Sequence, residues 1–191
     1  GRVIDRILSD LQEVGYEVDY KILNALDFGV PQKRERTIIV GSLIGLDTFK
    51  WPKGGIPMKP LSEILEQKPD DKFFVSERIY KKRLSAHDPV VTPSIWHENK
   101  SGNVSSYPYS CALRAGASYN YLLVDGKRRL TPRETLRLQG FPDTYKIICA
   151  DDQVKKQTGN AVAVPVVQAV IGRLKDVIER CEVAGNRKKT A

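Results

Sequence analysis

The sequence predicts an α/β fold that is interrupted by a loop-rich insertion, and three observations lead to this prediction. A helical pattern and two strand-like segments occupy residues 3–40. Prolines, glycines and serines are then scattered over residues 45–127, with short helical patches at 60–66 and 76–84. An irregular segment inside a compact chain indicates a functional insertion or a small domain. Helical patterns return at residue 131, which resumes the α/β order.

The first 40 residues are predicted to form a helix followed by two strands. Apolar residues recur at helical spacing over residues 3–14, and Gly15 follows where helices commonly end in glycine. Residues 16–23 have a strand pattern, and a turn over residues 27–31 leads to residues 37–40, which read Thr-Ile-Ile-Val. Because this run is apolar and almost unbroken, we expect a strand that is buried on both faces.

The last part of the chain is predicted to form two helices. Thr131 as N-cap, Pro132 at the first helical position and Glu134 two residues later make a capping box, and this helix ends at Gly140. Residues 161–180 carry apolar side chains at helical spacing and predict a long amphipathic helix.

The composition favours a nucleic-acid partner and argues against a membrane-spanning protein. The 191 residues include 31 Lys and Arg against 23 Asp and Glu, a formal net charge of +8. Such a balance favours polyanionic partners, nucleic acid first. No apolar run approaches the ~20 residues that a transmembrane helix requires.

The cysteines and histidines predict neither a disulfide framework nor a metal site. Cys111, Cys149 and Cys181 are odd in number and widely spaced, which indicates a reducing compartment. His87 and His97 have no other good metal ligands nearby, so we expect ordinary loop residues. The chain begins with glycine rather than methionine, which indicates a processed chain or a segment of a longer protein.

A polar cluster precedes the second predicted strand. In an extended chain Gln32, Arg34 and Arg36 share one face, while Lys33 and Glu35 point the other way. Two guanidinium groups and an amide on one edge suit phosphate oxygens and a base carbonyl. The alternative is a charged, solvated beginning of a strand, and the pattern alone leaves both open.

Two further clusters lie near the predicted helices. The arginines around the capping box either contact DNA phosphates or brace the insertion through ion pairs, and we favour bracing; they are Arg128, Arg129, Arg133 and Arg137. Gly159 and Asn160 are predicted to form a tight turn at the start of the long helix, where free N–H groups and the amide can meet a polar ligand. The alternative is a simple N-cap by Asn160.

Taken together, these clusters resemble motifs eight, nine and ten of the DNA (cytosine-5) methyltransferase family. Residues 24–36, 129–134 and 159–162 are similar to the three motifs in that order. The resemblance implies the C-terminal part of a Rossmann-like methyltransferase domain, with a helix, an antiparallel strand pair and a final helix, and an inserted target-recognition domain. The implied parts are the end of the catalytic domain (1–44), the target-recognition domain (45–127), the motif-nine helix and connection (128–158), the returning helix (159–185) and a frayed tail (186–191).

The resemblance also implies a reaction and a cofactor. Enzymes of this family flip a cytosine out of double-stranded DNA, attack its C6 with a cysteine thiolate and methylate C5 from S-adenosylmethionine. By motif match, Arg36 would hydrogen-bond the cytosine O2 and Arg34 would support the pocket. Gln32 would be a pocket or DNA contact. The cofactor pocket would be lined by Asn160, Ala161 and Val162.

The implied target-recognition domain would read bases in the major groove. The candidate reading loops are residues 101–106 and 114–121, with Arg114, Ser118 and Asn120 as DNA contacts. The alternative for either loop is a plain turn, and the sequence leaves both open. Two positions depart from the family pattern, because Ala112 stands where a threonine often precedes leucine and Ala161 stands where motif ten often has serine.

The family's glycine-rich cofactor loop, Pro-Cys nucleophile and Glu-Asn-Val acid are not found, and no cysteine here follows a proline. We therefore expect a chain that is inactive without an N-terminal half, from the same gene or a separate subunit, and whose strands and final helix expose apolar faces. The resemblance implies a cytoplasmic bacterial or archaeal restriction–modification enzyme. The alternatives are a non-enzymatic sequence-specific DNA-binding module and a basic RNA-binding protein, which would need stacking aromatics that residues 16–40 do not offer.

Overall fold

The computed structural model describes residues 1–89 and 91–189, and the chain divides into two compact units. Unit 1 comprises Gly1–Leu23, Glu35–Gly54 and Val166–Ala191. Unit 2 comprises Asn24–Arg34 and Gly55–Pro165. The second unit therefore begins its main segment ten residues after the predicted boundary at residue 45, and it also includes a short segment that carries Gln32 and Arg34 of the first polar cluster. The assignment of residues 45–127 to a target-recognition domain stays a prediction.

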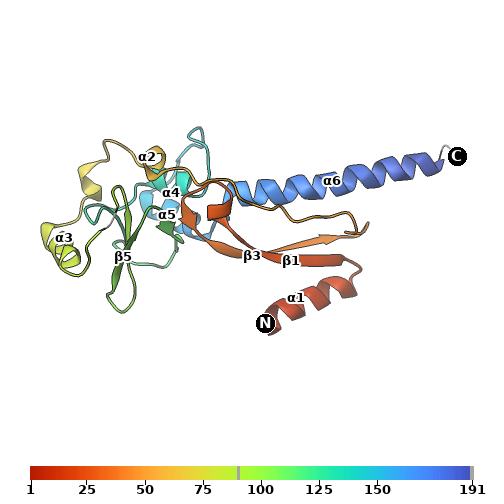
Figure 1. The fold of residues 1–191 in the computed structure, drawn as a ribbon, viewed down its shortest axis with the longest axis horizontal. Coiled ribbons are helices and arrows are strands. Elements are labelled where there is room, and N and C mark those ends of the chain that lie inside the picture. The colour runs from red at the N-terminus through yellow and green to blue at the C-terminus, as the bar shows by residue number, and fades with distance from the viewer. Residues whose placement is uncertain (90, 190–191) are drawn as a thin grey trace. The chain divides into compact units, whose positions relative to one another are not determined.

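Unit 1 contains the elements predicted at the start of the chain and most of the final helix (Figure 1). They are α1 (Arg2–Glu13), β1 (Glu17–Asn24), β3 (Glu35–Ser42) and α6 (Val164–Lys189). Gly15 has φ +94° and follows the end of α1 as expected. The strands β1 and β3 pair in a two-stranded sheet. The helix and both strands are thereby confirmed to within two or three residues at each end, whereas α6 runs past its predicted end at residue 185.

The burial of β3 is a correction. Ile38 and Ile39 are only half-buried, and Val40 alone is buried in this strand. Within the described chain β3 has one neighbouring strand, so its faces are not covered as those of a central strand would be.

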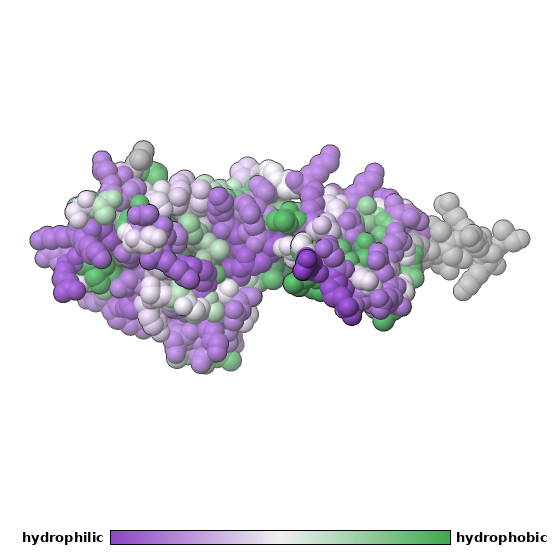
Figure 2. Space-filling model, turned by 90° about the horizontal axis from the view of Figure 1, so that it is seen from below, coloured by the Kyte–Doolittle hydropathy of each residue, from purple (hydrophilic) through white to green (hydrophobic). Residues whose placement is uncertain are grey.

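Several apolar side chains of unit 1 reach the surface, as the sequence predicted for the strands and final helix. No residue of α1 is buried, and Val3 keeps 74% of its surface exposed. Ile22 on β1 and Ile171 on α6 are also exposed. Figure 2 shows hydrophobic residues at the molecular surface among the polar ones. Within residues 1–89 and 91–189, no helix has the length and apolarity to cross a membrane.

Unit 2 is built on a three-stranded antiparallel sheet of order β5-β4-β7. Its strands are β4 (Ile95–Glu98), β5 (Val104–Tyr107) and β7 (Leu122–Val124). The central pairs are Trp96 with Ser106 and Trp96 with Leu123. Ile95, Trp96 and Leu123 are buried at the centre of this unit. The sheet was not predicted, because its strands are short and have no clear alternation.

Short helices surround this sheet. The predicted patches are confirmed as α2 (Leu61–Ile64) and α3 (Glu77–Leu84), and short 3₁₀ turns occupy Ala25–Asp27 and Asp71–Phe73. The two-residue strands β2 (Gln32–Lys33) and β6 (Ser110–Cys111) pair in parallel.

The capping box at α4 (Pro132–Leu138) is confirmed. Thr131 Oγ1 accepts a hydrogen bond from the Glu134 N–H at 3.2 Å, and Glu134 Oε2 accepts one from the Thr131 N–H at 2.8 Å. Gly140 then ends the segment with φ +80°, as predicted.

The next helix was missed. Residues Asp151–Asn160 form α5, so Gly159 and Asn160 end one helix instead of starting the next. The predicted tight turn and the alternative N-cap by Asn160 are both wrong. Residues 161–163 connect α5 to α6 without helical structure.

Candidate functional site

Three side chains in unit 2 form a buried hydrogen-bonding network that joins the first and third sequence clusters to the end of α4. We call Gln32, Arg34 and Gln139 the polar cross-brace. Gln32 has no exposed surface. Its Nε2 donates to the Leu138 carbonyl at 2.8 Å, and its Oε1 accepts from the Leu113 N–H at 3.0 Å. Gln32 was predicted as a pocket or DNA contact, and a direct DNA contact is corrected, because both ends of its amide are committed to backbone groups inside the unit.

Arg34 extends this network to the end of α5. Its side chain is buried, with 2% of its surface exposed. One nitrogen, Nη1, donates to the Leu113 carbonyl at 2.8 Å. The other, Nη2, donates to the carbonyls of Gly159 at 3.0 Å and Ala161 at 2.5 Å. A single planar guanidinium thus fixes the segment before loop 114–121 against the segment that follows α5.

Gln139 and two glycines complete the junction. The Gln139 Nε2 donates to the Thr158 carbonyl at 2.6 Å, and its own carbonyl accepts from the Val164 N–H at 2.8 Å. A Cβ on Gly159 would lie 2.2 Å from the Ala115 nitrogen, and one on Gly140 would lie 2.4 Å from Pro165 Cδ. Side chains at these positions would force the backbones apart, so Gly159 is required here for close approach rather than for turn geometry.

Two of the four arginines near α4, Arg128 and Arg137, brace the fold through ion pairs, as the sequence favoured. Arg128 and Glu134 form a bidentate pair with both distances at 2.8 Å, and both side chains are buried. Glu134 Oε1 also accepts from the Glu66 N–H at 2.7 Å, which ties α4 to the end of α2.

Arg137 makes a second brace on the same helix. Its Nη1 donates to the Ile64 carbonyl at 3.0 Å, and its Nε bonds Asp143 at 2.8 Å. The hydrogen bond from Arg137 holds the pKa of the Asp143 carboxyl below its ordinary value. Arg128 and Arg137 are therefore structural, as we expected.

The remaining arginine of the first cluster has different surroundings. Arg36 lies on β3 in unit 1 and is exposed, and its Nη1 donates to the carbonyl of Glu35 at 2.7 Å. The run from Gln32 to Arg36 is not one strand, because β2 ends at Lys33 and β3 begins at Glu35. The prediction that Gln32, Arg34 and Arg36 share one face is therefore wrong. Gln32 and Arg34 are buried, whereas Arg36 is exposed to solvent.

The candidate cofactor residues sit at the end of α5 and directly after it. The Asn160 side chain is exposed, and Val162 keeps 39% of its surface exposed. Ala161 is half-buried, and its carbonyl is held by Arg34. The Asn160 amide and the Val162 side chain are thus both exposed, on a backbone that Arg34 holds through the Ala161 carbonyl. This arrangement suits one wall of a pocket for a ligand with polar and apolar parts.

The candidate DNA-reading loop is held at both ends. The Arg114 N–H donates to the Tyr121 hydroxyl at 2.9 Å, and its exposed guanidinium lies 5.0 Å from the Tyr121 ring centroid. Burial raises the pKa of the Tyr121 phenol. Ser118 is exposed, whereas Asn120 is half-buried and its carbonyl accepts a hydrogen bond from Arg83. Arg114 and Ser118 are thus available to a large partner, and Asn120 is less so.

The second candidate loop is a hairpin turn between β4 and β5. Asn99 Oδ1 accepts from the Ser101 and Asn103 N–H groups at 2.9 and 3.0 Å, and Gly102 has φ +83°. This turn projects residues 99–103 from the sheet, and the predicted loop 101–106 continues into β5.

The model of the C-5 cytosine-specific DNA methylase family matches residues 1–176. Among curated relatives, the type II methyltransferase M.NgoBI of Neisseria gonorrhoeae is 52% identical over 172 residues, which is 88% of this chain and 54% of that protein. M.HaeII of Haemophilus aegyptius is 53% identical over 175 residues, again covering 88% of this chain and 54% of the relative. The chain thus spans about half the length of these relatives.

Solved structures show the same fold. The Entamoeba histolytica methyltransferase EhMeth superimposes with a TM-score of 0.70 at 16% identity, covering 92% of this chain and 58% of that one. A Spodoptera frugiperda DNMT2 mutant gives 0.69 at 18% identity, covering 91% and 62%. At these identities the likeness establishes an α/β methyltransferase fold and nothing finer.

Proposed function

Because this chain belongs to the C-5 cytosine-specific DNA methylase family, we propose that it is the C-terminal, DNA-reading part of a DNA (cytosine-5) methyltransferase of a restriction–modification system. One observation carries the proposal: the polar cross-brace joins the segments that resemble motifs eight and ten to the end of α4, the helix that begins in the segment resembling motif nine, in one buried network. A buried guanidinium and two buried amides are costly to desolvate, and here their hydrogen bonds hold these segments against one another.

In this proposal Arg36 grips the target base. Its exposed guanidinium offers N–H donors that suit the O2 of a cytosine turned out of the helix. The base must leave the stack because a nucleophile and a methyl donor cannot both reach it inside the duplex. Arg34 acts as a positioning residue, because its donors are directed at backbone carbonyls.

The family uses S-adenosylmethionine, which supplies the methyl group, and Asn160, Ala161 and Val162 fit one wall of its site. The exposed Asn160 amide can hydrogen-bond a polar group of the cofactor, and Val162 can pack against an apolar part. Arg34 fixes this wall through the Ala161 carbonyl. Two arginines that are two apart in the sequence thus have different roles in this proposal. Arg36 binds the cytosine, and Arg34 positions the residues proposed to contact the cofactor.

We propose that the catalytic thiolate comes from a segment outside these 191 residues, in the same polypeptide or in a separate subunit. Cys111 is half-buried, and burial raises the pKa of its thiol, which disfavours the reactive thiolate. Cys149 lies 3.8 Å from the Gln157 amide oxygen, and the side chain of Cys181 lies outside the described residues. The exposed apolar residues of unit 1, Val3 and Ile22 among them, are a surface that this N-terminal half would cover.

Residues 45–127 are proposed to recognise a specific site in double-stranded DNA. Arg114 and Ser118 are the exposed contacts in the first loop, and Arg114 offers the bidentate geometry that suits guanine. Asn120 could reach a base only with its side chain, because its carbonyl is bound by Arg83. The hairpin turn at residues 99–103 is the second reading element.

The proposal is tested by complementation. The 191-residue chain is mixed with a matching N-terminal half that carries the Pro-Cys nucleophile, and transfer of labelled methyl groups from S-adenosylmethionine to DNA is measured. Transfer is expected with both halves and with neither alone. If the chain binds a DNA site tightly and specifically but restores no transfer with a folded matching half, the alternative of a non-enzymatic DNA-binding module is correct.

A further inference from the structure

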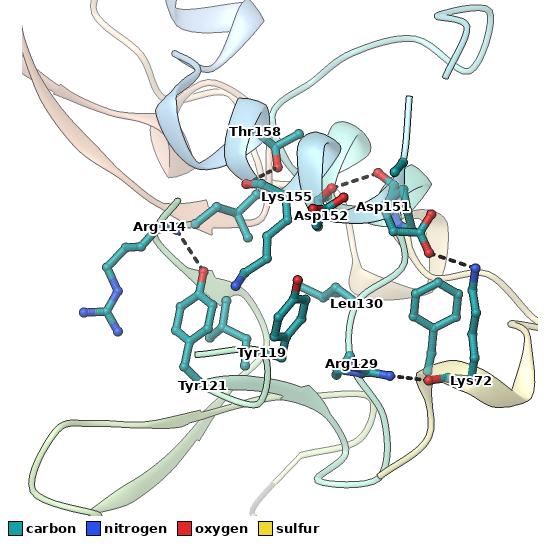
Figure 3. A pocket seen from close by; sticks show the side chains of 16 residues that line it. Lys72, Arg114, Tyr119, Tyr121, Arg129, Leu130, Asp151, Asp152, Lys155 and Thr158 are labelled. Atoms are coloured by element: carbon teal, nitrogen blue, oxygen red, sulfur yellow. Dashed lines mark hydrogen bonds and ion pairs between the residues drawn. The ribbon is translucent and has the colours of Figure 1, made fainter. Parts of the chain in front are cut away.

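A cavity of about 570 Å³ lies within unit 2, beside the loop of residues 114–121 (Figure 3). Its walls come from the start of α5, the segment before α4 and the loop itself. Much of the lining is apolar or aromatic, and it includes Phe73, Leu113, Tyr119, Tyr121, Leu122 and Leu130. This volume lies in the range of small-molecule sites, about 300–1,000 Å³.

The polar part of the lining is mainly cationic. Four cationic side chains face two carboxylates, which leaves a formal surplus of two positive charges; they are Lys72, Arg114, Arg129, Lys155, Asp151 and Asp152. Lys72 and Asp151 pair with each other at 2.8 Å. The surplus therefore rests on the other three cations, which are Arg114, Arg129 and Lys155.

Two of these cations lie over the same aromatic ring. Lys155 Nζ is 4.1 Å and Arg129 Cζ is 5.9 Å from the centroid of Tyr119, and Figure 3 shows Lys155 extending from α5 toward this ring. Lys155 Nζ also donates to the Ala117 carbonyl at 2.5 Å, and burial lowers its pKa. Arg129 Nη2 donates to the Lys72 carbonyl. Neither of these carbonyl contacts neutralises its cation, so an anion in the cavity would offset the charge of both.

The cavity wall is preformed. The Leu113 carbonyl is held by Arg34, and the Thr158 carbonyl is held by Gln139, so two lining residues belong to segments fixed by the polar cross-brace. A wall that is already ordered saves the entropy that a ligand would otherwise spend on ordering it.

We propose that this cavity binds a nucleoside monophosphate unit, with its phosphate near Lys155 and Arg129 and its base against the apolar wall around Phe73 and Leu130. The unit is either a free nucleotide or a single nucleotide that has left the stack of a DNA strand. The DNA source rests on the proposed function, whereas binding of a free nucleotide does not. The inference accounts for both halves of the lining, because a phosphate alone leaves the apolar wall unused and an apolar ligand leaves the charges of Lys155 and Arg129 without a counter-anion.

Titration calorimetry on the 191-residue chain tests the binding. The probes are the four deoxynucleoside monophosphates, the corresponding nucleosides and inorganic phosphate. We expect saturable binding of at least one monophosphate and weaker binding of its nucleoside and of phosphate. Replacing Lys155→Gln should weaken the monophosphate about tenfold, since it removes one charge-assisted contact. The matched control is Lys156→Gln, which removes the same charge from an exposed neighbour that does not line the cavity and should leave affinity unchanged.

A second variant covers the aromatic wall. Tyr119→Ala should also weaken the monophosphate, and circular dichroism checks that both variants keep the wild-type fold. No saturable monophosphate binding to the folded wild-type chain, equal loss in the Lys155 and Lys156 variants, or phosphate binding as tight as the nucleotide would each overturn the inference.

A DNA arm separates the two sources. A duplex with one unpaired 2-aminopurine nucleotide is compared with the fully paired duplex, and fluorescence reports the environment of the unpaired base. Tighter binding of the unpaired duplex that is lost in Lys155→Gln and kept in Lys156→Gln identifies a strand nucleotide, and monophosphate binding without this preference identifies a free one. If methyl transfer is restored in the complementation assay but neither the monophosphates nor the unpaired duplex binds in the cavity, this inference is wrong and the proposed function stands. If the nucleotide binds but transfer is not restored, the inference stands and the proposed function is wrong.

Discussion

Replacing Arg34 should destabilise unit 2 more than any exposed substitution in the same segment. Arg34→Met keeps the length of the side chain and removes every donor, so the carbonyls of Leu113, Gly159 and Ala161 lose this partner together. Each buried carbonyl left without a partner costs ~1–3 kcal/mol. Because water reaches part of the Ala161 end, we expect a loss of about 3–5 kcal/mol in the free energy of unfolding, the range seen when a buried charged network is broken.

Urea denaturation followed by circular dichroism measures this loss, and hydrogen exchange assigns it to unit 2 through the amides of residues 113–115 and 159–164. Arg34→Lys should lie between the wild type and Arg34→Met, because one ammonium can reach one carbonyl but not three. The matched control is Lys33→Met, an exposed neighbour that should change stability by less than ~0.5 kcal/mol. If Arg34→Met stays within ~1 kcal/mol of the wild type, the cross-brace is not what holds these segments.

Three further outcomes are expected. Gly159→Ala should cost ~3 kcal/mol or more by urea denaturation, since its Cβ would lie 2.2 Å from the Ala115 nitrogen; Gly116→Ala, with open space around it, should cost under ~1 kcal/mol, and equal costs would contradict the packing role. Arg36→Gln should leave the unfolding curve unchanged and lower methyl transfer in the complementation assay at least ~100-fold, whereas full activity would remove Arg36 from the base grip. Alkylation of Cys111 at about pH 8 should be slower than that of free cysteine and should accelerate at higher pH, because burial raises its pKa; a rate equal to free cysteine would contradict this.

Periodic elements could be predicted from the sequence, and elements without periodicity could not. The first helix, the strands β1 and β3 and the capping box at Thr131 follow from spacing and from capping chemistry that act within a few residues. By contrast, α5 buries only Val154, Thr158 and Gly159, so its apolar stripe is too thin to detect, and it has a glycine where helices are weakened. The short strands of unit 2 depend on pairing between segments far apart in the chain.

The site shows the same division more sharply. The predicted alternation holds from Gln32 to Arg34 and fails at Arg36, which is exposed, because β2 ends at Lys33 and β3 begins only at Glu35. Which side faces the core was not predictable from the run itself. Polar side chains are buried where carbonyl and amide groups can hydrogen-bond them. Here those partners lie 79 to 127 residues further along the chain than Gln32 and Arg34.

This distance explains why a motif can be recognised while the role of its members is misjudged. Gln32 was expected to contact DNA because an amide beside two arginines suits a polyanion, yet the Leu113 N–H and the Leu138 carbonyl occupy both of its ends. Two members of the cluster, Gln32 and Arg34, thereby hold the fold in register, and Arg36 alone keeps its guanidinium exposed. In such a motif, substituting a buried member leaves backbone groups inside the fold without their partners. The exposed member, Arg36, can be substituted without loss of the fold. A structural role for Arg34 and a base-binding role for Arg36 are therefore distinguished by comparing the effects of their substitutions on stability and on methyl transfer.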